Sequence, residues 1–290
     1  MIRTKTIQKR PDAILTSDWH LREDTPVCRT DNFQEAQWYK LGYIRGLQSK
    51  YQCPVIHAGD LFHHWKPSPY LLSMAMMYLP DEFYTIYGQH DLPQHNLQLA
   101  NKSGIYALMV AGKLTILPGC SWGQDPKEGS DLFGNKVLVW HKMNYQGKLP
   151  WPGCTDPLAA ALLRKYPQYD LILTGDNHKP FVESYQNRLV VNPGSLMRQE
   201  AGQVSHYPRV YLWYKDDNRV EIALIPIEEG VVTREHIEVK EQRDSRISAF
   251  IEQLNTEYNT SMSFEENLEA FKNLNNIRES VMQIIYNAIE

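Results

Sequence analysis

Five apolar segments of this chain end in side chains that can bind a metal ion. Each segment reads as a buried strand and is followed at once by carboxylate, imidazole or amide groups. The groups at the five ends are Asp18 and His20, Asp60, Gln89 and His90, His141, and Asp176 and His178. The carboxyl ends of strands in an open α/β sheet face the ligand crevice, so we expect these groups to converge.

Any one of these ends has an ordinary structural explanation. An Asp-x-His sequence after a strand is common by chance, and Asp18 could simply cap a turn. His57 lies inside an apolar segment and is more typical of a core histidine than of a ligand, whereas the sequence leaves the role of His206 open. Five such ends in one chain are hard to explain as independent turns, which favours a shared metal site.

A mixed set of carboxylate, imidazole and amide ligands suits divalent ions, Mn²⁺ first, with Mg²⁺, Zn²⁺ and Fe²⁺ as alternatives. A carboxylate shared by two ions holds them roughly 3.5–4 Å apart, the arrangement used for in-line attack on phosphorus. Two ions lower the pKa of a shared water and neutralise phosphoryl oxygens, and a nearby histidine can protonate the departing oxygen. The pattern therefore favours hydrolysis of a phosphoester.

Strands and helices alternate through most of the chain. Apolar runs predict strands at 13–20, at 53–60, from Phe83, at 136–142 and at 170–178, and shorter ones at 181–185, 189–192, 209–214 and 220–226. Helices are predicted at 30–51, from Ser68 with Pro69 at its first position, at 103–112, and from Asp156 and Pro157. The order predicts a layered α/β core that finishes in an antiparallel β section.

The character of the sequence changes near Glu229, and residues 229–290 carry 6 basic and 12 acidic side chains. One helical stripe of apolar residues runs from Ile247 to Tyr258 through Phe250, Ile251 and Leu254. Ser263 and Glu266 form a capping box, and a second stripe continues from Phe264 to Ala288. We therefore expect one domain at 1–228, and a linker with two amphipathic helices at 229–290.

The composition limits the classes of partner and compartment. The 290 residues carry 30 basic and 34 acidic side chains, so no global basic surface indicates nucleic acid. Phosphate would have to be bound locally, and the candidates near the motifs are Lys66, Lys142, Lys179, Arg198 and Arg209. The four cysteines form no C-x-x-C pair, and neither a signal peptide nor a membrane-spanning run is present. We expect a soluble cytoplasmic protein.

The motifs "SDWH", "GDLFHH", "GQHD", "WHK" and "GDNH" occur in the order seen in calcineurin-like metallophosphoesterases, and the chain resembles that family over 13–226. The resemblance implies a layered β-sandwich core flanked by helices, here with a C-terminal helical extension. "GDLFHHWKPS" and "VVNPGSLMR" look most similar to the SbcD-type nuclease subunit of DNA double-strand-break repair complexes. That branch implies a metal-dependent DNA exonuclease and endonuclease.

The resemblance also implies a role for each motif residue. Asp18, His20 and His178 would bind one ion, Asp60 would bridge, and Gln89, His141 and Asp176 would bind the second ion. His90 would act near the leaving group, oriented by Asp91, and His63 would line the site. Two positions depart from the family pattern: Gln89 replaces an asparagine and Asp176 replaces a histidine, which tilts the second site towards Mn²⁺ or Mg²⁺.

The partners implied by this resemblance are DNA and an SbcC-type, SMC-like ATPase bound by the C-terminal helices, with a homodimer as a further expectation. The apolar stripes of these helices could instead pack on the phosphoesterase core. Two other functions remain open at this point. One is a phosphodiesterase or phosphatase acting on a small nucleotide or phosphoprotein, and the other is a non-catalytic scaffold with a degenerate metal site at Gln89 and Asp176.

Overall fold

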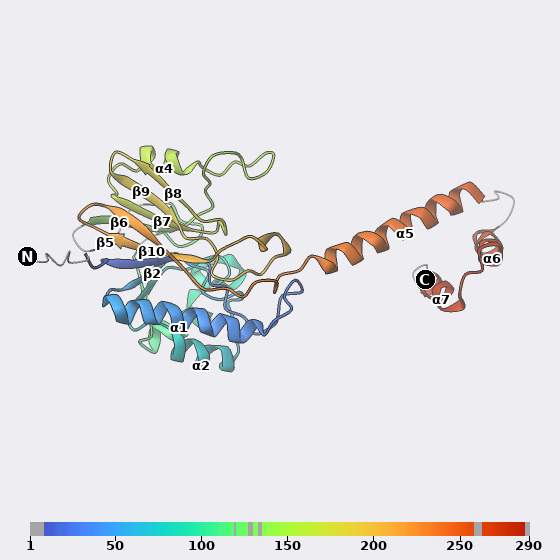
Figure 1. The fold of residues 1–290 in the computed structure, drawn as a ribbon, viewed down its shortest axis with the longest axis horizontal. Helices are drawn as coiled ribbons and strands as arrows, with labels where there is room; N and C mark the ends of the chain where they lie inside the picture. The colour runs from blue at the N-terminus through green and yellow to red at the C-terminus, as the bar shows by residue number, and fades with distance from the viewer. Residues whose placement is uncertain (1–8, 119, 127–129, 133–134, 258–262, 288–290) are drawn as a thin grey trace, which may run out of the picture. The chain divides into compact units, whose positions relative to one another are not determined.

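The computed structural model describes residues 9–118, 120–126, 130–132, 135–257 and 263–287 (Figure 1). The chain forms two compact units, one that ends at Thr233 and one that begins at Arg234. Thr30 N–H donates to the Val231 carbonyl at 3.1 Å and Thr233 N–H donates to the Cys28 carbonyl at 2.8 Å, so residues beyond Glu228 are tied to the first unit. None of the helices in the described ranges combines the length and apolar character that a membrane span needs.

The first unit contains two β-sheets. The strands of the six-stranded sheet lie in the order β11-β10-β1-β2-β3-β4, and those of the five-stranded sheet in the order β5-β6-β7-β9-β8. The bounds in the first sheet are β1 Ala13–Thr16, β2 Val55–His57, β3 Phe83–Thr85, β4 Thr115–Ile116, β10 Arg209–Tyr214 and β11 Arg219–Leu224. Those in the second sheet are β5 Ser130–Leu132, β6 Asn135–His141, β7 Leu171–Gly175, β8 Phe181–Tyr185 and β9 Arg188–Asn192.

The predicted antiparallel section is divided between the two sheets. Strands β1 to β4 are parallel, and so are β6, β7 and β9. Strand β8 pairs antiparallel with β9 in the second sheet, whereas β10 returns to the first sheet, where Leu212 lies opposite Ile14. The layered α/β fold class is confirmed, and the return of β10 is what joins the end of the unit to its first strand.

Helices cover the outer faces of both sheets, so the unit has four layers (Figure 1). Leu15 and Ile56 contribute to a core cluster that also contains Val139 and Leu173 of the other sheet, and this cluster lies between the sheets. Neighbouring strand residues face outwards into a second cluster with α1 Phe33–Tyr51, α2 Pro69–Tyr78 and α3 Gly104–Val110. The outer face of the second sheet packs on α4 Ala159–Lys165. Burial on both faces explains the continuous apolar runs.

Two predicted helix starts have different outcomes. Ser68 caps α2, since its Oγ accepts the Leu71 N–H at 3.1 Å with Pro69 at the first helical position. The predicted start at Asp156 and Pro157 is wrong, because α4 begins only at Ala159. Leu158 instead forms a β-bridge with Tyr145, and this pairing holds the chain extended before the helix. Short 3₁₀ helices lie at Pro93–His95, Leu97–Lys102 and Ala201–Gln203.

Within the described residues of the second unit, three helices lie where two were predicted: α5 Glu235–Glu257, α6 Phe264–Asn275 and α7 Glu279–Asn287. The capping box of Ser263 and Glu266 is confirmed. The predicted continuous stripe is interrupted because Asn276 adopts a left-handed conformation, with φ of 52°, and ends α6. Tyr258 and Ala288 of the predicted stripes lie outside the described residues.

Candidate metal centre

The loops that follow β1, β2 and β7 carry several predicted ligands in an unusual backbone conformation. Asp18, His20, Asp60 and Asp176 have positive φ angles of 50°, 45°, 57° and 77°. Residues other than glycine rarely adopt such angles, and they persist where the surrounding structure fixes them. The loops fix one another: Asp18 N–H donates to the Gly59 carbonyl, His20 N–H to the Asp60 carbonyl, and Asp176 N–H to Asp18 Oδ1, at 3.0–3.1 Å.

Trp19 anchors the first of these loops between its two polar neighbours. Its side chain is fully buried, and its Nε1 donates to Thr16 Oγ1 at 2.7 Å. The indole contacts the rings of His57 and Phe83, with centroids 5.2 and 5.1 Å apart. Burial lowers the pKa of His57 to about 3, so this imidazole is neutral in the core, where its Nδ1 lies 2.9 Å from Thr85 Oγ1.

The first predicted set of ligands comes together in the structure. The candidate ligand atoms of Asp18, His20 and His178 all lie within 4.8 Å of one another. His20 Nε2 is 3.1 Å from His178 Nε2. This close approach lets one imidazole donate to the other, and it equally suits two lone pairs that converge on a shared cation.

Asp60 lies between this set and His141. Its Oδ2 is 3.7 Å from His20 Nε2 and 3.4 Å from His141 Nε2, and Asp18, Asp60 and His141 form a second group within 4.8 Å. The other oxygen, Oδ1, accepts the backbone N–H of His90 at 2.8 Å. Burial would lower the pKa of His141, but the charge of Asp60 raises it to about 10. A carboxylate in this position fits the predicted bridging role.

Gln89 and Asp176, the two departures from the family pattern, contact each other. Gln89 Nε2 donates to Asp176 Oδ1 at 2.8 Å, which leaves Gln89 Oε1 buried without a hydrogen-bond partner among the described residues. Asp176 therefore orients the amide, and the amide oxygen is left free to act as a ligand. Asp176 joins none of the groups of three candidate ligands found in the described ranges, so its own role as a ligand stays a prediction.

Several buried side-chain atoms of these residues lack a hydrogen-bond partner in the described segments, and their chemistry indicates whether the residues fit metal ions. Asp18 Oδ2, His20 Nδ1, Asp60 Oδ2, Gln89 Oε1 and His141 Nε2 are buried, and none has a hydrogen-bond partner within the described part of the chain. Each such atom costs about 1–3 kcal/mol when it stays unpaired. Their concentration at one place, with oxygen and imidazole nitrogen as the donor atoms, fits a pair of divalent cations.

His63 and His90 lie next to this centre. Their rings are stacked with centroids 5.4 Å apart, and their candidate ligand nitrogens lie within 4.8 Å of each other and of one on His20. His90 Nδ1 is 2.8 Å from the backbone carbonyl of His63. Because a carbonyl only accepts, His90 Nδ1 must carry the proton, and Nε2 is the nitrogen left for chemistry.

The predicted orientation of His90 by Asp91 is wrong. The Asp91 carboxylate accepts backbone N–H groups from Asp60, Phe62 and Gly88 at 2.9, 3.1 and 3.0 Å. Asp91 therefore joins the loop after β2 to the loop after β3, and the His63 carbonyl takes over the orientation of the imidazole. Burial raises the pKa of Asp91 to about 7, since the carboxylate is fully enclosed by these loops.

Gly88 is required by this packing, which gives a testable prediction. A Cβ atom at Gly88 would overlap the backbone nitrogen and Oδ1 of Asp60, whereas one at Gly42 on α1 would meet nothing within 4 Å. We expect Gly88→Ala to displace Asp60, to abolish metal-dependent hydrolysis and to destabilise the fold by about 1–3 kcal/mol. Gly42→Ala should stabilise it by about 0.5–1 kcal/mol, since alanine favours a helix.

Thermal unfolding and bound-metal content of both alanine variants check this expectation. A Gly88→Ala protein that keeps full metal content and activity would contradict the tight packing of Asp60 against the loop.

A cavity of about 650 Å³ opens beside the centre and is lined in part by His141, Asp176 and His178. Three tryptophans and two lysines complete much of the lining: Trp122, Trp140, Trp151, Lys142 and Lys179. Trp122 and Trp151 lie in loops, where no periodic pattern marks them, so the sequence reasoning missed both. The Trp151 side chain is 49% exposed to solvent.

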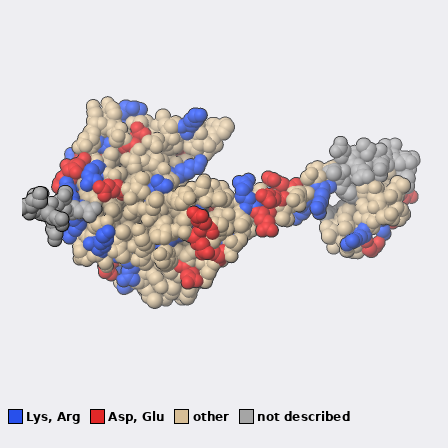
Figure 2. Space-filling view, in the orientation of Figure 1, with Lys and Arg blue, Asp and Glu red and all other residues tan. Residues whose placement is uncertain are grey.

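The five predicted phosphate contacts do not form one surface. Lys142 and Lys179 line the cavity, and Lys142 Nζ lies 3.6 Å from Asp156. Arg198 lines a different cavity, Lys66 is exposed, and Arg209 Nε donates to the Tyr207 carbonyl. His206 Nε2 lies 2.8 Å from the Ser195 carbonyl, outside the ligand groups. Figure 2 shows lysine and arginine scattered singly over the visible face of the first unit.

Comparison with solved structures finds similar proteins at low sequence identity. An archaeal phosphodiesterase is 13% identical, with a TM-score of 0.43, and the match covers 73% of this chain and 99% of that one. Vps29 from Entamoeba histolytica is 14% identical, with a TM-score of 0.37 and coverages of 74% and 99%. A conserved uncharacterized protein from Streptococcus pneumoniae TIGR4, a predicted phosphoesterase, is 13% identical, with a TM-score of 0.39 and coverages of 77% and 95%.

No curated protein sequence matches the chain. The sequence model of the calcineurin-like phosphoesterase superfamily domain, however, matches residues 13–212, which include all the strand ends that carry the centre and, of the described strands, leave out only β11 and the end of β10. This match extends over more than half of the chain, and it agrees with the two-sheet fold and the clustered aspartates and histidines. The chain therefore belongs to the calcineurin-like phosphoesterase superfamily.

Proposed function

We propose that this protein is a metal-dependent nuclease that hydrolyses phosphodiester bonds of DNA. The observation that carries the proposal is the group of unpaired buried ligand atoms at Asp18, Asp60, Gln89 and His141, which lies beside a cavity lined by lysines and tryptophans. When bound there, two divalent ions would supply an activated water and neutralise the phosphoryl oxygens. Mn²⁺ suits the mixed oxygen and imidazole donors best.

The chain's own residues would hold the ions and donate a proton to the leaving group. Asp18, His20 and His178 would hold one ion, and His141 and Gln89 the other, with Asp60 between them. His90 Nδ1 is fixed by the His63 carbonyl, so in the protonated imidazole Nε2 carries a second proton that can be given to the leaving oxygen. His63, stacked on His90, would keep that ring in place.

DNA is proposed as the substrate because of the cavity beside the centre. Lys142 and Lys179 can bind backbone phosphates, and Trp122 and Trp151 offer faces on which an unpaired base can stack. The hydrogen bond from Gln89 to Asp176 leaves the amide oxygen unpaired, so Gln89 could supply an oxygen ligand to a second ion, which favours a working centre over a degenerate scaffold.

Hydrolysis assays with Mn²⁺ test the proposal. Linear single-stranded and double-stranded DNA should be cleaved, and bis-p-nitrophenyl phosphate and cyclic nucleotides should be turned over more slowly. Lys142→Ala and Lys179→Ala should lower DNA cleavage more than hydrolysis of the small ester, whereas Lys113→Ala, at an exposed lysine, serves as the matched control. Turnover of cyclic nucleotides with DNA left intact would refute the nuclease and favour a nucleotide phosphodiesterase.

We also propose that the C-terminal unit binds an SMC-like ATPase. On α6 and α7, Leu274 and Ile284 are 75% and 69% exposed, and Phe264 and Val281 are exposed as well. Apolar side chains on short amphipathic helices suit a coiled-coil partner. Deletion of 234–290 should leave a soluble protein that still hydrolyses bis-p-nitrophenyl phosphate but no longer co-elutes with the ATPase. An insoluble truncated protein would show that the helices belong to the core.

A further inference from the structure

A second cavity, of about 420 Å³, is lined by three buried cationic side chains that the metal centre does not use. Arg29, Lys40 and Arg198 are only 8%, 4% and 4% exposed, and all three line this cavity. They come from the loop before α1, from α1 itself and from the segment after β9. Folding therefore brings Arg198 next to Arg29 and Lys40, which lie far from it in the sequence.

Two of these three cations form no ion pair with a carboxylate in the described part of the chain. Arg29 forms a two-point pair with Asp31, with Nε to Oδ1 at 2.8 Å and Nη2 to Oδ2 at 2.5 Å. Lys40 Nζ donates to the Pro226 carbonyl at 3.2 Å, and Arg198 donates to the carbonyls of Val204 and Glu228. In the described part of the chain, Asp31 is the one carboxylate that forms an ion pair with any of the three, while Glu35 and Glu228 line the cavity without such a pair.

Buried charges without an ionic partner are costly, and proteins retain them where an anion binds. Burial first, and then the charges of Arg198 and Arg29, lower the pKa of Lys40 to about 7. A bound phosphate would supply the missing negative charge and accept hydrogen bonds from the donors of Lys40 and Arg198 that no protein group uses.

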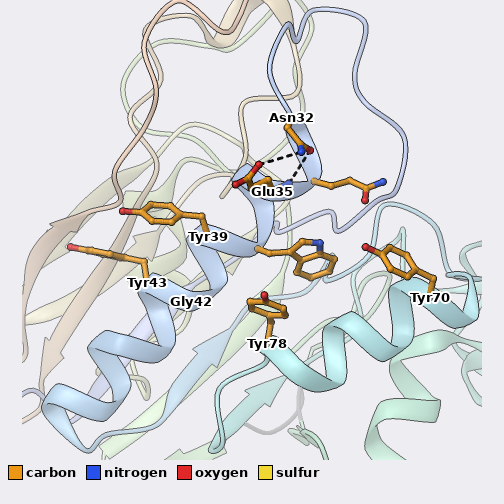
Figure 3. A pocket seen from close by; sticks show the side chains of 9 residues that line it. Asn32, Glu35, Tyr39, Gly42, Tyr43, Tyr70 and Tyr78 are labelled. Carbon is orange, nitrogen blue, oxygen red and sulfur yellow. Dashed lines mark hydrogen bonds between the residues drawn. The ribbon is translucent and has the colours of Figure 1, made fainter.

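An aromatic cleft adjoins this cationic cavity. The cleft has a volume of about 730 Å³, and its lining includes Trp38, Tyr39, Tyr43, Tyr70 and Tyr78. Tyr39 lines the cleft and the cavity alike, together with Asn32 and Glu35. Figure 3 shows Tyr39 and Tyr43 extending from α1, and Tyr70 and Tyr78 rising from α2 on the other side of the cleft.

Two of these rings are open to solvent, since Tyr39 is 60% exposed and Tyr70 is 49% exposed. Exposed aromatic faces next to cations are the arrangement that binds unpaired nucleic acid bases, by stacking, together with their phosphates. Glu35 at the rim opposes an anion, and its carboxylate accepts from Asn32 Nδ2 at 3.3 Å (Figure 3).

We propose that the cationic cavity and the aromatic cleft together bind a nucleotide. Its phosphate would be bound by Arg29, Lys40 and Arg198, and its base would stack on Tyr39. The segment that carries Arg198 also contacts a loop of the metal centre, since Gln199, next to Arg198, donates to the His20 carbonyl at 3.2 Å. The source of the nucleotide is an unpaired strand of the DNA substrate, and this part of the proposal rests on the proposed function. A free nucleotide presents the same chemistry.

Binding of a fluorescent oligothymidylate to the full-length protein in EDTA tests the proposal. EDTA removes divalent ions, so neither cleavage nor the metal centre contributes to the signal. Tyr39→Ala and Lys40→Gln should each weaken binding about fivefold or more, the range expected for loss of one stacked base or one phosphate contact. Lys40→Arg should retain binding, because it keeps the charge. Glu35→Gln should strengthen it.

Lys50→Gln at the far end of α1 and Tyr185→Ala on β8 are matched controls, since both residues are exposed. Unchanged affinity in Tyr39→Ala, a surface change that keeps the fold, would overturn the proposal, as would equal losses in the controls. Competition experiments distinguish an unpaired DNA strand from a free nucleotide as the source. If thymidine monophosphate displaces the fluorescent oligothymidylate as effectively as the unlabelled oligonucleotide does, a DNA strand is not the source. Hydrolysis by the wild-type protein in Mn²⁺ is scored separately, so failure of the nuclease proposal remains distinguishable.

Discussion

Asp60→Asn should abolish hydrolysis of every phosphoester substrate while the fold survives. Asp60 Oδ2 faces both His20 and His141, at 3.7 and 3.4 Å, so its charge is shared between the two predicted ion positions. Asparagine keeps an oxygen that can accept the His90 N–H but removes the negative charge. A loss of roughly 10³-fold or more is expected, since ion-assisted charge stabilisation supplies several kcal/mol and each 1.36 kcal/mol is tenfold in rate.

The measurement is the rate of bis-p-nitrophenyl phosphate hydrolysis in Mn²⁺, with circular dichroism and thermal unfolding to show that the fold is intact. Asp81→Asn, at an exposed carboxylate, is the matched control and should leave the rate unchanged. A variant at Asp60 that turns over at the wild-type rate would remove this residue from the centre.

The second large effect is expected for His90→Ala, which should lower the rate by about 10²–10⁴-fold, the usual contribution of a general acid. Metal binding should survive, because the contact of His90 with Asp60 is made by the backbone N–H and alanine retains it. Rate and manganese affinity, measured on the same preparation, separate the two roles. His64→Ala, at an exposed histidine nearby, is the control.

Loss of metal in His90→Ala would indicate that His90 is a ligand. His20, His63 and His90 also form a group that could hold an ion. If His90→Ala loses metal in proportion to its rate, His90 is a ligand in that group, and its assignment as a general acid is wrong.

The strand ends were predictable because their information is local. Each ligand follows an apolar run directly, and parallel strands place their carboxyl ends at one edge. Asp18, Asp60 and His141 accordingly lie in one group in the structure. The positive φ angles of Asp18 and Asp60 leave no trace in the sequence, because aspartate also adopts ordinary turns.

Features that depend on long-range contacts were not predictable. The sequence does not show that β10 pairs with β1 in the other sheet from β8 and β9, nor that Asp91 is surrounded by the backbone N–H groups of two loops. The pairing of Gln89 with Asp176 spans two loops that are distant in the chain. The division of the C-terminal stripe at Asn276 depends on one left-handed residue, and an apolar period continues across it unchanged.

Anomalous diffraction from crystals grown in manganese tests the central claim, that these loops hold a pair of divalent ions, most directly. Two peaks are expected on either side of Asp60, one against Asp18, His20 and His178 and the other against His141. A single peak, peaks elsewhere on the molecule, or none at all would contradict the account.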